Sequence, residues 1–382
     1  MRYFFLISLF TLNLYASSPK RIPETKKINQ SIEFLDDLNL SNLKLAIQRQ
    51  LKSFENSDLT VSFKLGTEDY KRSDLKDSLL HFNKLVDKTI LCLDVIDAKT
   101  CYSELSLSLN TEFNIYSPIP KVTERGHQTG QTLFTAYYSP DLHGSLVKTS
   151  KYKHAIYKRP LDNKLARATR EDIDYKDKFK GLGLELFYVS ESRYDIWLLH
   201  VEGGGRVQVE NKDGSITKHF LSYESSNKQK FQMLFKYMIA SGMLSKGNAG
   251  IDNQRRYLEE HPEHEQEIMA SSPSYIYFKV TQDEPLGVKN IPLTENRSLA
   301  SDYRIYKEYG ILNFIQAKKP IRKNGKVENV PFSRFFINQD TGGAIRGNAR
   351  SDLYFGFGAE AQTAANNLKH LGNQYFLIKK KQ

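Results

Sequence analysis

The chain has 382 residues, enough for one large domain or two ordinary ones, and its 40% hydrophobic and 12% aromatic content excludes global disorder. The net charge is +11, but the lysines are dispersed, and the only run of three basic residues is Lys379 to Lys381. Dispersed charge is more typical of a soluble protein than of a nucleic-acid-binding one, so we expect no nucleic-acid partner. It would also suit a polyanionic substrate.

The N-terminal residues have the order of a secretory signal peptide. Arg2 precedes an apolar run from Tyr3 to Tyr15, and the small residues Ala16 to Ser18 follow. The run is short for a membrane span, and no cysteine beside the cleavage region offers a site for lipid attachment. We therefore predict a signal peptide over residues 1–18 and a soluble periplasmic protein, able to associate with the cell wall or the outer membrane.

The two cysteines, Cys92 and Cys101, allow two interpretations. An oxidising compartment would permit a disulfide that closes a short loop. Alternatively, Cys92 is a core residue of the apolar run Ile90 to Ile96. The disulfide is the favoured interpretation.

Helical patterns dominate from about Ile32 to Tyr116. Ser41 is the expected cap of one amphipathic helix, and Ser73 is the expected cap of a second. Their apolar faces indicate packing, with no residues that suggest chemistry. The inward residues are Leu43, Ile47, Leu51 and Phe54 in the first helix and Leu75, Leu79, Phe82 and Val86 in the second.

From Leu133 onward, short alternating runs separated by glycine turns predict β-structure. An amphipathic helix around Phe231–Ile239, a charged helical stretch around Arg255–Met269 and a short helix near Glu360–Leu368 interrupt it. Many short strands with few helices are typical of barrels. The expected strands are Leu133–Tyr138, Ala155–Arg159, Leu184–Val189, Ile196–Val201, Arg206–Glu210, a strand through Phe220, Tyr275–Val280, Leu312–Ala317, Phe335–Gln339 and Tyr375–Ile378.

Two aspartates, Asp340 and Asp352, are set among five glycines in the segment QDTGGAIRGNARSDLYFGFG. Clustered glycines indicate tight turns or the close approach of a ligand to the backbone. A carboxyl group held there beside apolar strands can have a raised pKa and act as an acid. The alternative is a pair of turn aspartates that bind their own backbone. The segment alone does not separate the two readings.

Other candidate motifs are weaker. His261, Glu263, His264 and Glu265 form the densest group of metal-binding residue types, but HPEHEQE lacks the spacing of a His-Glu-x-x-His site, which favours a solvated charged face. The glycines at 203–205 lie between two expected strands and open no helix, so they do not indicate nucleotide binding. We expect no metal and no cofactor.

Asp340-Thr341-Gly342 also matches the triplet of aspartic proteases. In those enzymes apolar residues directly precede the aspartate, whereas Asn338 and Gln339 precede it here. The chain also has no second triplet. The protease reading is therefore disfavoured.

Six segments in fixed order carry a more specific resemblance. They are FTAYYSP (134–140), YKRP (157–160), HVEGGGRV (200–207), SSPSYIYF (271–278), PLTENRSLASD (292–302) and QDTGGAIRG with SDLYFGFG (339–358). This succession resembles the lytic murein transglycosylase A family of bacterial cell-wall enzymes. The resemblance runs from about Thr60 to the C-terminus.

The resemblance implies a mainly β (α+β) fold in which a double-psi β-barrel domain carries an inserted second small β-barrel domain. A broad groove separates the two. Residues 19–140 would hold the N-terminal helices and the first part of the double-psi barrel, residues 141–270 the inserted barrel, and residues 271–382 the C-terminal part. That last part resembles a module with three characteristic aspartates, which fall here on Asp302, Asp340 and Asp352.

The resemblance also implies the chemistry. Asp352 corresponds to the catalytic residue, a single general acid and base that cleaves the bond from N-acetylmuramic acid to N-acetylglucosamine and leaves a 1,6-anhydro end. Asp340 is the supporting neighbour, and Asp302 is a third, more structural aspartate in the groove. We expect Asp340 and partial burial by Tyr354 or Phe355 to raise the pKa of Asp352.

Groove roles follow from residue chemistry. Tyr137 and Tyr138 could stack on sugar faces, with a place in the barrel core as the alternative, and Arg206 could meet a peptide or lactyl carboxylate. Arg297 is expected to orient a loop or an aspartate. The partners expected are peptidoglycan glycan strands, with cell-wall synthesis or division proteins beside them, and a monomer is expected.

The chain departs from the family pattern at three places in these segments. Ala136 stands where glycine is usual, and Glu202 and Gly204 stand where glutamine and serine are usual. A glutamate adds a charge where an amide would hydrogen-bond, which bears on sugar binding. Two other functions compete: an inverting hydrolase that uses Asp340 and Asp352, and a cell-wall-binding module without catalysis.

Overall fold

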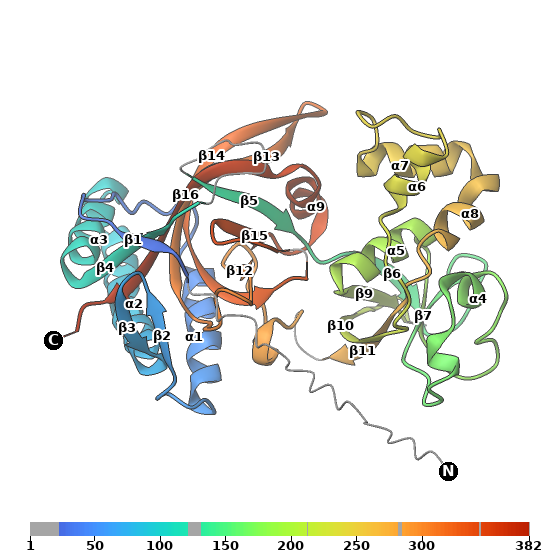
Figure 1. Ribbon diagram of the computed structural model, residues 1–382, viewed down its shortest axis with the longest axis horizontal. Helices are drawn as coiled ribbons and strands as arrows, with labels where there is room; N and C mark the ends of the chain where they lie inside the picture. Colours follow the sequence, from blue (N-terminus) through green and yellow to red (C-terminus); the bar gives the residue numbers. More distant parts are fainter. Residues whose placement is uncertain (1–22, 121–130, 212, 282–284, 344, 382) are drawn as a thin grey trace, which may run out of the picture.

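The computed structural model describes residues 23–120, 131–211, 213–281, 285–343 and 345–381. It has two parts, joined where β5 leads into β6 and where β11 leads toward β12 (Figure 1). The expected signal peptide lies outside the described residues. Within them, the structure has no helix that is both long and apolar enough to cross a membrane.

The first part is built on a closed barrel of six strands. The order is β16-β13-β14-β12-β15-β5, and β5 pairs again with β16 to close it. Pairs β12–β14 and β15–β5 are parallel and the others are antiparallel. The strands are β5 (Thr132–Tyr137), β12 (Ser298–Ser301), β13 (Leu312–Lys323), β14 (Lys326–Thr341), β15 (Arg350–Tyr354) and β16 (Lys369–Lys379). The closed barrel with an inserted domain confirms the expected fold class.

Helices and two further strands flank this barrel. The 15-residue helix α1 (Ser41–Glu55) and α2 (Arg72–Leu93) bury the apolar faces read from the sequence against β13, β14 and β16. Helix α3 (Ala98–Glu112) lies within the stretch expected to be mainly helical, and Cys101 near its start forms a disulfide with Cys92 at the end of α2. The favoured interpretation of the cysteines is thereby confirmed. Strands β1 (Thr25–Lys27) and β4 (Phe113–Pro118) extend the sheet from β16, β2 (Ser62–Leu65) and β3 (Glu68–Lys71) form a hairpin, and α9 (Gly358–Asn367) packs on β5 and β13.

The inserted part is a six-stranded sheet in the order β11-β10-β9-β6-β8-β7. Its edge strands β7 and β11 approach each other, with the rings of Tyr157 and Tyr275 6.5 Å apart, so the sheet curls toward a small barrel. The strands are β6 (Asp141–Ser145), β7 (His154–Tyr157), β8 (Glu185–Val189), β9 (Gly204–Glu210), β10 (Ile216–Ser226) and β11 (Ile276–Thr281). Strand β11 pairs with β10, although the expected boundary at residue 271 places it with the C-terminal part.

The helices of the inserted part are α4 (Arg170–Asp174), α5 (Arg193–Glu202), α6 (Leu234–Ala240), α7 (Ile251–Glu260) and α8 (Glu265–Ala270). Helix α5 corrects the predicted strand Ile196–Val201. Ile196 and Leu199 pack on the sheet, while Trp197 and Leu198 pack on the helical layer of α6 and α8, so α5 is apolar on both sides. An apolar run of this kind has no periodicity that separates helix from strand.

The expected setting of the glycines at 203–205 is corrected as well. They lie between a helix and a strand, and not between two strands. Gly203 has φ 75° and ends α5 in the left-handed conformation that glycine adopts without steric cost. Gly204 and Gly205 then begin β9, where a side chain at Gly205 would meet the carbonyl oxygen of Pro140 at 2.7 Å.

Two buried arginines fasten the N-terminal segment to the barrel. Arg297 is fully buried, and its guanidinium binds both carboxylate oxygens of Asp36 at 2.6 and 2.9 Å. Arg334, also fully buried, binds Asp37 at 2.8 and 2.7 Å. Arg297 thus orients an aspartate, as expected from the sequence.

We predict that Asp36→Ala destabilises the barrel part by about 3 to 5 kcal/mol, because it leaves the Arg297 charge buried without its partner. Chemical unfolding followed by far-ultraviolet circular dichroism measures the change. Asp69→Ala is the control: Asp69 forms an exposed pair with Lys64 at 2.8 Å, so its loss should cost less than about 1 kcal/mol. An equal effect of the two substitutions would contradict the prediction.

Candidate active site

The two glycine-set aspartates lie on either side of one strand of the barrel. Ala300 of β12 pairs with Asp352 of β15 on one side and with Asp340 of β14 on the other. Asp352 is in turn opposite Thr135 of β5. Paired residues of neighbouring strands project to the same face, so these four side chains form a row across the sheet. With strands about 4.8 Å apart, the Cα atoms of the two aspartates are about 10 Å apart.

A bulge brings Asp340 into this row. Along the β12–β14 pair, Leu299 is opposite Asn338, but the next residue, Ala300, is opposite Asp340. The skipped residue, Gln339, is fully buried, and its side-chain amide donates to the carbonyl oxygen of Ala46 in α1. Because strand residues alternate between faces, a regular register would place Gln339 opposite Ala300 and turn Asp340 away.

Asp352 is held by a single neighbouring hydroxyl. Thr135 Oγ1 donates to Asp352 Oδ1 at 2.5 Å. Burial raises the pKa of Asp352, while the Thr135 hydrogen bond and the charge of Arg350 oppose the rise without cancelling it. A carboxyl group with a raised pKa retains its proton to higher pH, as a general acid requires.

Asp340 has a different environment. Tyr137 Oη donates to Asp340 Oδ2 at 2.7 Å, and the backbone N–H of Thr341 donates to Oδ1 at 2.8 Å. Burial raises the pKa of Asp340 to about 6; these hydrogen bonds oppose the rise, and the charge of Asp352 adds to it. The expectation that Asp340 raises the pKa of Asp352 is therefore corrected: burial is the main cause for Asp352, and the repulsion raises the pKa of Asp340.

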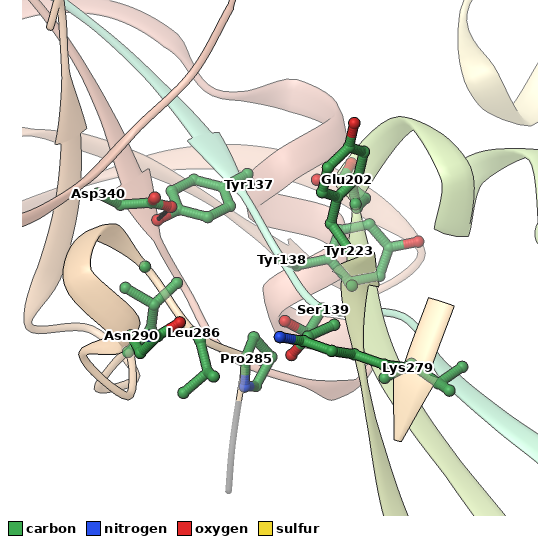
Figure 2. Close-up of a pocket in the computed structure, with 16 residues that line it drawn as sticks. Tyr137, Tyr138, Ser139, Glu202, Tyr223, Lys279, Pro285, Leu286, Asn290 and Asp340 are labelled. Atoms are coloured by element: carbon green, nitrogen blue, oxygen red, sulfur yellow. Dashed lines mark hydrogen bonds between the residues drawn. The ribbon is translucent and has the colours of Figure 1, made fainter. Parts of the chain in front are cut away.

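A cavity of about 240 Å³ lies between the two parts of the chain at this site. Figure 2 shows Asp340 and Tyr137 on one side of it, and Glu202 with Tyr138 and Tyr223 on the other. Asp352 is not among its lining residues, but its charge reaches the cavity, because it raises the pKa of Glu202 on the opposite wall. Tyr138 also borders a second cavity of about 380 Å³, so the hollow continues past it.

The predicted tyrosines have separate placements. Tyr137 hydrogen-bonds Asp340, and its ring centre is 5.2 Å from that of Tyr354. Tyr138 is 7% exposed and packs in the barrel core, while its edge borders both cavities. Most of the Tyr138 ring therefore lies in the barrel core, which was the alternative expected for it. Stacking of either ring on a sugar stays a prediction.

Arg206 and Asp302 lie outside the cavity lining. Arg206 forms a two-pronged pair with Asp141 and lies over the ring of Phe357, 4.4 Å from its centre. Asp302 is fully buried, and burial would raise its pKa, but hydrogen bonds from Arg304 and the backbone N–H of Gly347 hold that pKa at about 2. A carboxyl group this acidic is suited to holding the loop before β15 and not to donating a proton.

From the sequence we expected Glu202 to add a negative charge, and the structure corrects this expectation. Burial, together with the negative charge of Asp352, raises the pKa of Glu202 to about 8, so near neutral pH its carboxyl group is mostly protonated. It then offers a hydrogen-bond donor, as an amide would. Thr135 and Ala300 were also missed, since only strand register places them beside the aspartates.

The group of His261, Glu263 and His264 also comes together in space. One ligand atom of each lies within 4.8 Å of the others, on the helical edge of the inserted part, and Tyr257 hydrogen-bonds His264 at 2.7 Å. Glu263 is exposed, as a solvated charged face requires. None of the three lines the cavity that Asp340 borders.

Comparison with known proteins agrees with this architecture. Residues 133–279 match the MltA specific insert domain, and residues 297–378 match the 3D domain. Membrane-bound lytic murein transglycosylase A of Vibrio cholerae is 29% identical over 255 residues, which cover 66% of this chain and 67% of that protein. The protein of that name from Escherichia coli K12 is 28% identical over 254 residues, covering 65% and 66%. The chain belongs to the membrane-bound lytic murein transglycosylase A family.

The matched segment covers about two thirds of the length of each of these two relatives. Solved structures extend the agreement in fold. A structure of Escherichia coli MltA with bound chitohexaose has a TM-score of 0.69 at 21% identity, covering 95% of this chain and 96% of that one. A membrane-bound lytic murein transglycosylase from Agrobacterium tumefaciens has a TM-score of 0.66 at 22% identity, covering 93% and 98%.

We predict that Tyr137→Phe raises the pKa of Asp340 above its value of about 6. The lost hydrogen bond stabilises the ionised form, so without it the carboxyl group retains its proton to higher pH. A carbon-13 titration of the aspartate carboxyl groups measures the shift. Tyr138→Phe, which removes a hydroxyl that does not bind Asp340, is the control; an unchanged pKa in Tyr137→Phe would refute the assignment.

Proposed function

We propose that the protein is a lytic transglycosylase that cleaves peptidoglycan glycan strands with Asp352 as its single general acid and base. The family membership supports the substrate class and the reaction type. The observation that supports the residue assignment is the place of Asp352 in the row beside Ala300, where the Thr135 hydroxyl orients its carboxyl group and burial raises its pKa. Cavity walls from both parts of the chain would receive the glycan.

The proposed reaction needs no water. Protonated Asp352 donates its proton to the glycosidic oxygen between N-acetylmuramic acid and N-acetylglucosamine, and the bond from that oxygen to the muramic C1 breaks. The muramic 6-hydroxyl attacks C1, and ionised Asp352 accepts the hydroxyl proton. The products are a 1,6-anhydromuramic end and a free N-acetylglucosamine 4-hydroxyl, and Asp352 is again protonated. The nucleophile belongs to the same sugar, which removes much of the entropic barrier.

Asp340 would support this step without exchanging the proton. Its hydrogen bonds from Tyr137 and Thr341 favour the ionised form at neutral pH, where a negative charge can stabilise the positive charge that develops at C1. Tyr137 would therefore act on the site through Asp340. Export to the periplasm, where such a substrate lies, is part of the proposal and is supported by the order of residues 1–18.

One observation favours a second candidate. Asp340 and Asp352 flank the same residue, Ala300, as two carboxyl groups of an inverting hydrolase could. In that reaction Asp340 would activate a water molecule. The Tyr137 and Thr341 hydrogen bonds weigh against this role, because both donors occupy oxygens of the carboxylate that would accept the proton from water.

We predict that Asp352→Asn lowers the release of 1,6-anhydro fragments from purified sacculi by at least about 100-fold, since an amide cannot donate the proton. Mass spectrometry of the soluble fragments measures both amount and type. A hydrolase releases fragments heavier by one water, which would favour the second candidate.

Asp213→Asn is the matched control, because Asp213 lies in an exposed turn of the inserted part, where it accepts hydrogen bonds from Ser215. Its digestion of sacculi should equal that of the wild type. Full activity of Asp352→Asn would overturn the catalytic assignment. Sedimentation of the wild type with sacculi that it never solubilises would overturn the enzymatic function and leave a binding module.

A further inference from the structure

Glu202 presents a second carboxyl group to the cavity, from the wall opposite Asp340. It is the last residue of α5 and belongs to the inserted part, whereas Asp340 and Asp352 belong to the barrel. Figure 2 shows its side chain at the end of that helix, beside Tyr138 and Tyr223. The cavity therefore has carboxyl groups on both walls.

The backbone around Glu202 leaves its carboxyl group accessible from the cavity. Gly203 and Gly204 follow it and also line the cavity, so this stretch of wall has no competing side chains. Gly203 ends the helix with φ 75°, and a side chain at Gly204 would lie 2.9 Å from the carbonyl oxygen of Leu221. A hydrogen bond from the backbone of Tyr138 anchors the carboxyl group.

We propose that Glu202, in its protonated form, is a substrate-binding residue that donates a hydrogen bond to an oxygen of the glycan in the cavity, such as an N-acetyl carbonyl. This inference rests on the proposed function for the identity of the glycan. A neutral carboxyl group has one O–H donor, whereas a carboxylate only accepts. Ionisation of Glu202 would thus remove the donor and place a negative charge against the same oxygen.

The surroundings of Glu202 favour the protonated form. Burial and the charge of Asp352 raise its pKa to about 8, against the opposing Tyr138 hydrogen bond. The cation Lys279 of β11 also lines this cavity. The titratable or charged groups that face this region from the packed elements are Tyr137 and Tyr138 of β5, Asp340 of β14, Asp352 of β15, Asp195 of α5, Tyr223 of β10, Lys279 of β11 and Arg255 of α7.

The test measures glycan binding, so that it does not depend on turnover. Chitohexaose is titrated by calorimetry into full-length Asp352→Asn and into the double variant Asp352→Asn/Glu202→Gln between pH 6 and 9.5. In the Asp352→Asn background one cause of the raised pKa is absent, so the midpoint should lie below about 8, and burial keeps it above the ordinary value. We expect binding to weaken roughly tenfold with rising pH in the single variant and to show no such loss in the double variant, whose amide still donates.

Glu210→Gln in the same background is the control. Glu210 lies at the opposite end of β9, where it binds Tyr152 and Lys151, so this variant should keep the pH dependence of Asp352→Asn. An identical pH dependence with and without Glu202 would overturn the proposal. So would binding that is independent of pH throughout.

A second measurement needs no substitution at Glu202. A carbon-13 titration of its carboxyl group, with and without chitohexaose, should show the pKa rising by about one unit when the glycan binds, because tenfold preference for the protonated form shifts a pKa by that amount. An unchanged or lowered pKa would refute the donor role. Failure of the lytic reaction would appear separately, in the fragments released by the wild type from sacculi, and would leave the binding result intact.

Discussion

The parallel pairing of β5 with β15 is the constraint on which the site depends. It places Thr135 opposite Asp352 and Tyr137 opposite Tyr354, and β16 then closes the barrel against the other edge of β5. Because β5 is held on both edges, its two functional side chains have little freedom to move. The residues that follow Tyr137 leave the barrel and lead straight into β6, where the carbonyl oxygen of Pro140 accepts a hydrogen bond from Arg206. Strand β5, which orients Asp352, therefore also fixes where the inserted part begins on the opposite side of the cavity.

The same kind of side chain serves different ends here because its surroundings differ. Asp302 has two sets of donors, from Arg304 and Gly347, and stays ionised far below neutral pH. Asp340 is partly buried with a tyrosine and a backbone donor, which leaves its pKa at about 6. Asp352 is partly buried beside the Thr135 hydroxyl, and Glu202 is partly buried beside the backbone of Tyr138. Desolvation and the donors and charges around each group together set its proton affinity, and residue type alone does not.

Much of the fold could be predicted from local patterns, and the parts that could not have physical reasons. The helices with one apolar face, such as α1 and α2, and the strand beginning near Leu133 follow directly from periodicity. Helix α5 does not, because the sheet and the helical layer bury both of its sides. The segment that holds Asp340 and Asp352 was recognised, but the bulge at Gln339 and the register of β12 arise from strands distant in sequence. Glu202 was noticed as a departure, yet its raised pKa depends first on burial and then on the charge of Asp352, which lies in a strand distant in sequence.

The two walls of the cavity are joined by weak contacts as well as by the chain itself, and this bears on the chemistry. Arg206 of the inserted part lies over Phe357 of the barrel part, and Arg322 at the end of the β13–β14 hairpin approaches Asp252 of α7 at 3.7 Å with both side chains exposed. Contacts of this kind contribute little to holding two domains at a fixed separation. The repulsion between Asp352 and Glu202 acts across the same separation and falls as it widens. A glycan that draws the walls together would strengthen the effect of the ionised Asp352 on Glu202 and so favour the protonated form of Glu202 in which it can donate a hydrogen bond.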